Sequence, residues 1–137
     1  MWNQTSLAGK RVLVTAGGDG IGLEIARAFA GAGSKVMVCD ISRESLARLA
    51  RDLPGVHSCL ADVSREQDVA SMFELVDQKL GGLDVLVSNA GMYPRRMLPD
   101  LTQEIWDETV DVNLRGHFFC CKYAIPAMIA FFRAPDL

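Results

Sequence analysis

The sequence predicts a doubly wound α/β fold, in which a parallel β-sheet carries helices on both faces. Three observations support this prediction. Short apolar runs alternate with longer segments whose apolar residues recur every three or four positions. Short connections that contain glycine, proline or capping residues separate these segments. The first apolar run leads through a glycine-rich loop directly into a helical pattern. Such alternation implies parallel strands joined by right-handed crossovers.

The first half of the chain shows the alternation clearly. An apolar run predicts a strand over about residues 11–15, and helical spacing predicts a helix over 20–32. A second apolar run predicts a strand over 35–39. Ser42 is a suitable N-cap for the next helix, which we expect to stop at the Pro-Gly pair after residue 53.

The second half continues the pattern through two more strands. Residues 56–60 are expected to form the third strand. Ser64-Arg-Glu-Gln67 matches a capping box at the start of the third helix, which a Gly-Gly pair ends. Residues 85–87 are expected to form the fourth strand. Thr102 is the expected cap of a last helical region that runs to about Ala130.

Four glycines, at positions 17, 18, 20 and 22, connect the first strand to the first helix. Glycine lets the backbone approach a phosphate closely, and the N–H groups of the first helical turn carry partial positive charge. A strand, a glycine loop and a helix N-terminus therefore make a cradle for pyrophosphate. The spacing is G-x-x-G-x-G and not G-x-G-x-x-G, so a glycine turn without phosphate is the alternative.

Asp40 ends the second apolar run, 18 residues beyond Gly22. An acid at this position can accept hydrogen bonds from the hydroxyls of an adenosine ribose, and it would repel a 2′-phosphate. It therefore favours NAD over NADP as the cofactor. The alternative role is an N-cap of the next helix, but Ser42 already supplies that cap.

Two further motifs lie at the expected carboxyl ends of strands, where ligands bind in this architecture. Asp62 can accept a hydrogen bond from an adenine amino group, or it can serve the turn before Ser64, and the sequence leaves both roles open. Asn89-Ala90-Gly91 places small residues where a cofactor ribose can lie against the backbone. A plain turn is the alternative for this motif.

Composition argues against several classes of partner. The 137 residues carry a net charge of −3, which does not suggest a nucleic acid or an anionic membrane as partner. The four cysteines form no C-x-x-C pair and neither histidine completes a metal spacing, so we expect no metal site. Buried, reduced thiols and a cytoplasmic location are expected. The longest apolar stretch is interrupted by Lys122 and Pro126, so it does not predict a membrane span.

Together these segments resemble the short-chain dehydrogenase/reductase family. The resemblance runs from about residue 7 to residue 128 and includes several motifs in the correct order. They are Leu7 to Thr15, the loop from Thr15 to Gly22, Asp40, Asp62-Val63, Ser88-Asn-Ala-Gly91, and Val110-Asp-Val-Asn-Leu-Arg-Gly116.

The resemblance implies a Rossmann domain of an NAD-dependent oxidoreductase, which transfers hydride between nicotinamide and an alcohol or carbonyl substrate. By this likeness the glycine loop would hold the pyrophosphate and Asp40 would select NAD. The loop residues concerned are Gly17, Asp19, Gly20, Ile21 and Gly22. Asp62 and Val63 would bind adenine, Asn89, Ala90 and Gly91 would line the ribose, and Asn113 would belong to the catalytic tetrad.

The sequence departs from the family pattern in two places. Ala16 stands where the family usually has its first glycine, which implies an altered loop geometry. The family also needs a serine and a Tyr-x-x-x-Lys motif, and neither Tyr93 nor Tyr123 has a lysine four residues later. We expect Tyr123 to pack on its own helix and Lys122 to be solvated.

These departures predict a single dinucleotide-binding domain over residues 1–137, truncated after about four strands and without dehydrogenase activity of its own. The alternative is a non-catalytic binding module or an interaction fragment. The fourth strand would then form an exposed edge, and the last helix would expose apolar side chains, so we expect self-association. These side chains are Leu114, Phe118, Phe119, Ile125, Met128, Ile129, Phe131 and Phe132.

Overall fold

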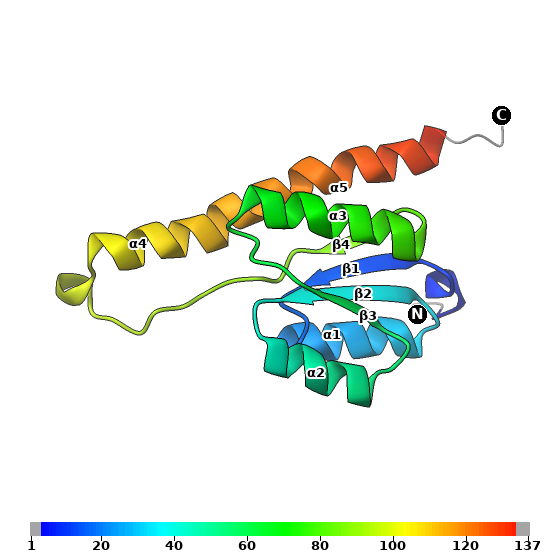
Figure 1. Cartoon of the computed structure of the whole chain (residues 1–137), viewed down its shortest axis with the longest axis horizontal. Coiled ribbons are helices and arrows are strands. Elements are labelled where there is room, and N and C mark those ends of the chain that lie inside the picture. Colours follow the sequence, from blue (N-terminus) through cyan, green and yellow to red (C-terminus); the bar gives the residue numbers. More distant parts are fainter. Residues whose placement is uncertain (1–3, 134–137) are drawn as a thin grey trace.

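The computed structural model describes residues 4–133 and contains a four-stranded parallel sheet between two layers of helices (Figure 1). The strand order is β3-β2-β1-β4. Strand β1 (Arg11–Thr15) pairs with β2 (Lys35–Asp40) on one side and with β4 (Val85–Val87) on the other. Strand β3 (His57–Leu60) pairs with β2. The predicted doubly wound fold is confirmed, and β4 lies at one edge of the sheet.

Helices α1 (Gly20–Gly31) and α2 (Arg43–Asp52) cover one face, and α3 (Glu66–Leu80) and α5 (Gly116–Arg133) cover the other (Figure 1). Because successive strand residues point to opposite faces, each strand supplies two cores. One core contains Val12, Val14, Val36 and Val38 with Ala26 and Leu49, and the other contains Leu13, Met37 and Cys39 with residues of α3 and α5.

Most of the predicted helix ends are confirmed. The Ser42 hydroxyl accepts a hydrogen bond from the Ser45 N–H at 3.1 Å, and Thr102 caps α4 (Gln103–Val110) in the same way. Gly81 ends α3 in a left-handed conformation. The predicted capping box is wrong: α3 begins after Arg65, and no side chain caps it.

The last helical region differs from a single continuous α-helix. A π-helical turn over Asp111–Arg115 joins α4 to α5, and the described part of α5 extends to Arg133. A π-helical turn has i→i+5 hydrogen bonds and is wider than an α-helical turn, and such turns often occur at functional sites. No helix among residues 4–133 combines the length and apolar character needed to cross a membrane.

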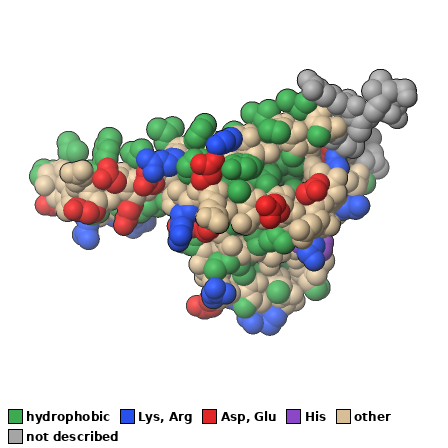
Figure 2. Space-filling view, turned by 45° about the horizontal axis from the view of Figure 1, so that its top comes forward, with side chains coloured by type: hydrophobic (Ala, Val, Ile, Leu, Met, Phe, Trp, Pro, Cys, Tyr) green, Lys and Arg blue, Asp and Glu red, His purple; other side chains and the backbone are tan. Residues whose placement is uncertain are grey.

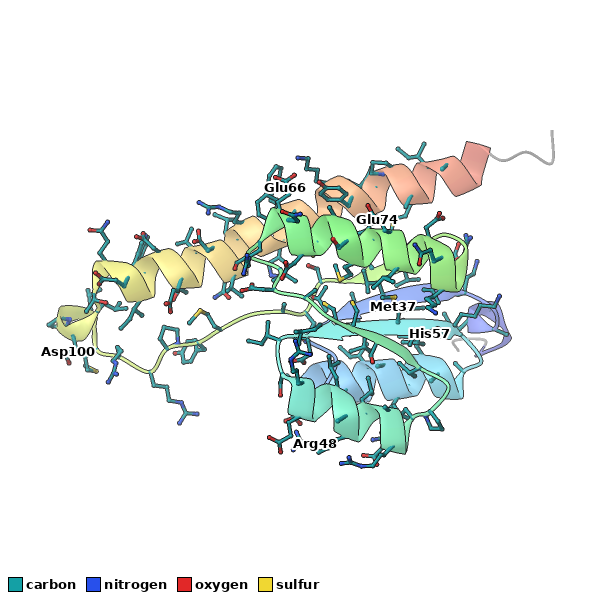
Figure 3. All side chains as sticks on the ribbon, in the orientation of Figure 1. Met37, Arg48, His57, Glu66, Glu74 and Asp100 are labelled. Atoms are coloured by element: carbon teal, nitrogen blue, oxygen red, sulfur yellow. The ribbon has the colours of Figure 1, made fainter. Side chains whose placement is uncertain are left out.

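Helix α5 is tied to α3 through two residues whose environments differ from the prediction. The Tyr123 ring stacks on Phe73 of α3, with ring centroids 6.0 Å apart, instead of packing on its own helix. Glu66, at the start of α3 beside α5 (Figure 3), accepts hydrogen bonds from Lys122 Nζ and from the Tyr123 hydroxyl. The hydrogen bond from Lys122 holds the pKa of Glu66 below its usual value. Lys122 is therefore exposed but paired.

Residues 92–115 form an arm that projects from the sheet (Figure 1). The arm consists of an extended loop, a 3₁₀ turn over Leu98–Asp100, α4 and the π-helical turn. None of these residues is buried, and large apolar side chains lie on its surface, among them Tyr93, Met97, Leu98, Trp106 and Leu114. Figure 2 shows hydrophobic side chains along this arm and α5. The arm has no core of its own.

Candidate functional site

A pocket of about 230 Å³ lies at the carboxyl ends of the strands. Five residues that the sequence analysis selected contribute to its lining: Asp40, Asp62, Val63, Ala90 and Gly91. They come from the ends of β2 and β3 and from the segment after β4, and the fold brings them together although they are far apart in sequence. Ala16 and Val112 also line the pocket, so its wall includes the glycine loop and the π-helical turn.

The Asp40 carboxylate is held in place by two backbone N–H groups. Its Oδ2 accepts from Gly18 at 3.0 Å, and its Oδ1 accepts from Ser42 at 3.0 Å. These bonds tie the end of β2 to the glycine loop and aim an acidic group at the pocket. The N-cap of α2 is Ser42, as predicted, so Asp40 does not cap that helix.

Asp62 serves the turn before α3 and also lines the pocket. Its Oδ1 accepts from the Ser64 N–H at 2.9 Å and from the Ser64 hydroxyl at 2.6 Å. This explains the failure of the predicted capping box, because Asp62 engages the hydroxyl that would have capped α3. In the described part of the chain, Asp62 Oδ2 accepts no hydrogen bond, so it remains available to a ligand in the pocket.

The glycine loop is tightly packed at Gly17, Gly18 and Gly22; a Cβ on Gly18 would lie 2.9 Å from Asp40 Oδ2. A Cβ on Gly22 would lie 2.2 Å from the Ala16 carbonyl oxygen, and a Cβ on Gly17 would lie 2.8 Å from the Val38 side chain. Gly20 has φ of +55°, and a Cβ there would meet no atom within 4 Å. The first turn of α1 therefore packs against the strands while its outer side stays open.

Ala16 has φ of 51°, and it is the residue that replaces the first glycine of the family pattern. The loop thus keeps a glycine-like backbone with a residue that has a Cβ. A left-handed conformation is strained for alanine. The expected alteration of the loop appears as local strain at this position, without loss of the turn.

The loop side of the site carries one acidic side chain. Asp19 caps α1 by accepting a hydrogen bond from the Gly20 N–H at 2.8 Å, and its Oδ2 lies 3.2 Å from Arg48 Nη2. Asp19, Gly20 and Ile21 line a larger and more open hollow of about 730 Å³ on the outer side of α1. Ile21 is 76% exposed. The carboxylates suited to bind a nucleoside, those of Asp40 and Asp62, line the smaller pocket. The smaller pocket is therefore the better candidate for the functional site.

Thr15 is a structural residue of the site that the sequence analysis did not select. It is completely buried, and its hydroxyl accepts from the N–H groups of Asn89 and Ala90 at 2.9 and 3.0 Å. The Asn89 side chain donates to the carbonyls of Thr15 and Ala16. Asn89 therefore holds the ends of β1 and β4 together and is not among the residues that line the pocket. The sequence feature that could have indicated this role is that Thr15 is a polar residue at the end of an apolar strand.

Asn113 lies in the π-helical turn and clamps the loop after β4. Its Oδ1 accepts from the Met92 N–H at 2.8 Å, and its Nδ2 donates to the Met92 carbonyl at 2.9 Å. A separate pocket of about 220 Å³ lies beside this clamp, and Tyr93 and Trp106 contribute to its lining. The clamp joins the two ends of the arm next to the main pocket, which Met92 and Val112 line.

Cys39 also lines the main pocket, but its thiol is not suited to act as a nucleophile. Burial raises the pKa of Cys39 far above its usual value, so the thiolate is not formed near neutral pH. Asp40 and Asp62 are therefore the charged side chains that line this pocket.

The sequence pattern of the short chain dehydrogenase family matches residues 10–134. The chain belongs to this family. L-fucose dehydrogenase of Bos taurus is 38% identical over 123 residues, covering 89% of this chain and 46% of that protein. D-xylose 1-dehydrogenase of Caulobacter vibrioides is 39% identical over 125 residues, covering 90% of this chain and 50% of that protein.

A solved structure supports the same assignment. A short-chain dehydrogenase/reductase from Brucella melitensis, described as a glucose/ribitol dehydrogenase, superposes with a TM-score of 0.83 at 31% identity. The match covers 88% of this chain and 52% of that structure. The chain spans about half the length of these relatives. Membership of the family implies a nicotinamide dinucleotide cofactor.

Proposed function

We propose that residues 1–137 form a single domain that binds a nicotinamide dinucleotide, with NAD preferred over NADP. The observation that carries this proposal is the pocket that collects Asp40, Asp62, Val63, Ala90 and Gly91 at the carboxyl ends of the strands. Asp40 accepts hydrogen bonds from the adenosine ribose, and its charge repels a 2′-phosphate. Asp62 Oδ2 accepts from the adenine amino group.

The glycine loop fits the phosphate end of the same ligand. Gly17 and Gly22 allow the loop to pack closely, and Gly20 leaves the first turn of α1 open on its outer side. The loop and the turn, including Asp19 and Ile21, hold the pyrophosphate, because helix N-termini favour anions. Val63 packs on the adenine, and Asn89 supports the ribose through the strand ends. When bound, the nicotinamide supplies hydride transfer.

For the whole protein to which this domain belongs, we propose oxidation or reduction of an alcohol or carbonyl group. Two relatives are named for L-fucose and D-xylose, which supports a sugar hydroxyl as substrate. Asn113 belongs to the catalytic machinery by family likeness, and here it positions the loop after β4. The 137 residues contain no Tyr-x-x-x-Lys to move the proton, so we propose that they bind cofactor without turnover.

A second role, self-association, is supported by a different observation. Phe118, Ile125 and Ile129 expose 59%, 53% and 43% of their surface on α5. When another apolar surface covers large side chains such as these, their removal from water lowers the free energy of association. We therefore propose that copies of this chain associate through α5 and the neighbouring arm.

The binding proposal is tested by titrating the chain with NADH and following nicotinamide fluorescence. The Asp40→Ala variant removes an acceptor of charge-assisted hydrogen bonds, so we expect its affinity for NADH to fall by roughly tenfold or more. Asp52→Ala, an exposed acid at the end of α2, is the matched control and should leave the affinity unchanged. Equal affinities for the wild type and Asp40→Ala would contradict the assignment.

A further inference from the structure

An ion pair beside the proposed adenosine site joins Asp19 of the glycine loop to Arg48, a residue with no assigned part in dinucleotide binding. Arg48 projects from α2 (Figure 3), and its guanidinium lies 3.2 Å from Asp19 Oδ2 and 3.4 Å from Glu44 Oε1. Its Nη2 also lies 3.2 Å from the Ser45 hydroxyl. The Arg48 side chain is 45% exposed, so the guanidinium lies at the protein surface and is free to change partners.

A short series of contacts connects Arg48 to the ribose side of the pocket. The Ser45 side chain touches Arg48, and Ser45 Cβ lies 3.0 Å from the position that a Cβ on Gly18 would occupy. Gly18 donates its N–H to Asp40 Oδ2 at 3.0 Å. Ser45 and Gly18 therefore connect the guanidinium to the Asp40 carboxylate, which is the proposed acceptor for the ribose hydroxyls.

The charges at this corner are unevenly distributed. Asp19, Asp40 and Glu44 supply three carboxylates, and Arg48 is the cation that contacts two of them. An arginine binds a phosphate through two parallel hydrogen bonds, provided that its N–H groups are not already committed. In this structure Arg48 Nη1 donates to Glu44, and Nη2 donates to Asp19 and to the Ser45 hydroxyl.

We propose that Arg48 is a cofactor-specificity residue, which Asp19 holds away from the adenosine 2′ position. Neutralising Asp19 removes the carboxylate that contacts Arg48 Nη2, and the exposed pair with Glu44 is weak enough to break. The guanidinium can then turn to a 2′-phosphate, so that NADP affinity rises relative to NAD affinity. This inference rests on the proposed dinucleotide site. It assigns the discrimination against a 2′-phosphate to two causes: the charge of Asp40 and the restraint on Arg48.

The test compares the dissociation constants of NADPH and NADH, measured by fluorescence titration, for the wild type and four variants. Asp19→Asn keeps an oxygen that can cap α1 but removes the charge that holds Arg48. Arg48→Ala and the double variant Asp19→Asn/Arg48→Ala remove the guanidinium. Arg51→Ala, an exposed arginine on the same helix, is a control that changes the net charge by the same amount as Arg48→Ala. The ratio of the two constants cancels any effect of Asp19 on the shared pyrophosphate.

We expect Asp19→Asn to shift the ratio toward NADPH by roughly tenfold, because a charge-assisted hydrogen bond to phosphate forms. The double variant should lose that gain, and Arg51→Ala should leave the ratio unchanged. An unchanged ratio in Asp19→Asn would overturn the role of Arg48, and so would a gain in NADPH affinity that persists in the double variant. In both cases, binding of NADH would still support the proposed dinucleotide site. If neither nucleotide binds any of the proteins, the proposed function fails and this inference fails with it.

Discussion

Ala16 carries a backbone conformation that glycine adopts at much lower cost. Its φ of 51° places Cβ close to the following carbonyl group, which costs about 1 kcal/mol or more for an L-residue. We expect Ala16→Gly to raise the free energy of unfolding by about 1 kcal/mol, because relief of the strain exceeds the added entropy of the unfolded chain. Urea denaturation followed by circular dichroism measures this change.

The same substitution at Ala28 is a matched control with the opposite expected sign. Ala28 is exposed within α1, where glycine is a poorer helix former than alanine. Ala28→Gly should therefore lower the free energy of unfolding by about 1 kcal/mol. If Ala16→Gly lowers stability as Ala28→Gly does, the strain at Ala16 is not the dominant effect.

The position of a residue could be predicted where it depends on local order along the chain. Asp40 follows a buried strand at a characteristic distance from the glycine loop, and it lies in the pocket at the carboxyl ends of the strands; its role toward a cofactor stays a prediction. Thr15 could not be predicted in this way. Its role is to accept two N–H groups from residues more than seventy positions later, which depends on β1 pairing with β4.

At the scale of elements, one ion pair fixes β4 against β1. Arg11 donates to both carboxylate oxygens of Asp84 at 2.9 Å, and each side chain is only 13% exposed. The hydrogen bonds from Arg11 hold the pKa of Asp84 below its usual value. A carboxyl with a lowered pKa in the folded state stabilises the fold above its unfolded pKa, about 3.9, and this stability disappears as the pH falls further.

We therefore expect the free energy of unfolding to fall as the pH drops from about 5 through the unfolded pKa of Asp84. Asp84→Asn should remove part of that acid dependence and destabilise the protein at pH 7 by about 2 kcal/mol, since Arg11 loses its charged partner. Urea denaturation at a series of pH values measures both effects. Asp84→Asn/Arg11→Gln, which removes both charges, should show the same flattened acid dependence. An acid dependence in Asp84→Asn equal to that of the wild type would refute this account.

Elements could be predicted to within a residue or two, because apolar periodicity and local caps decide them. Strand β2 and helix α1 each differ by one residue from the prediction. The errors arise where a tertiary neighbour competes. Ser64 fits a capping box by spacing, but the nearby Asp62 carboxylate takes its hydroxyl. Tyr123 stacks on Phe73 because α3 and α5 pack side by side on the same face of the sheet.

At the scale of the whole molecule, burial is unevenly distributed. The sheet has well-packed cores on both faces, whereas the arm of residues 92–115 contains no buried residue. The sequence predicts exposed apolar side chains along the last helix, and Leu114, Phe118, Ile125 and Ile129 are exposed. Phe119 differs, because it is buried against the sheet. Phe131 and Phe132 lie outside the residues whose side chains are described.

The exposed residues follow helical spacing, so they form one apolar stripe that a second helix can cover. We expect the chain to sediment as a dimer or larger species in analytical ultracentrifugation. Phe118→Glu and Ile125→Glu should each weaken association by at least roughly tenfold, because burying one large apolar side chain contributes about 1.5–3 kcal/mol. Ile41→Glu is the matched control, since Ile41 is 74% exposed but follows β2 and is not part of α5 or the arm. A wild-type monomer at the highest concentration tested, or equal weakening by Ile41→Glu, would mean that the stripe on α5 does not drive association.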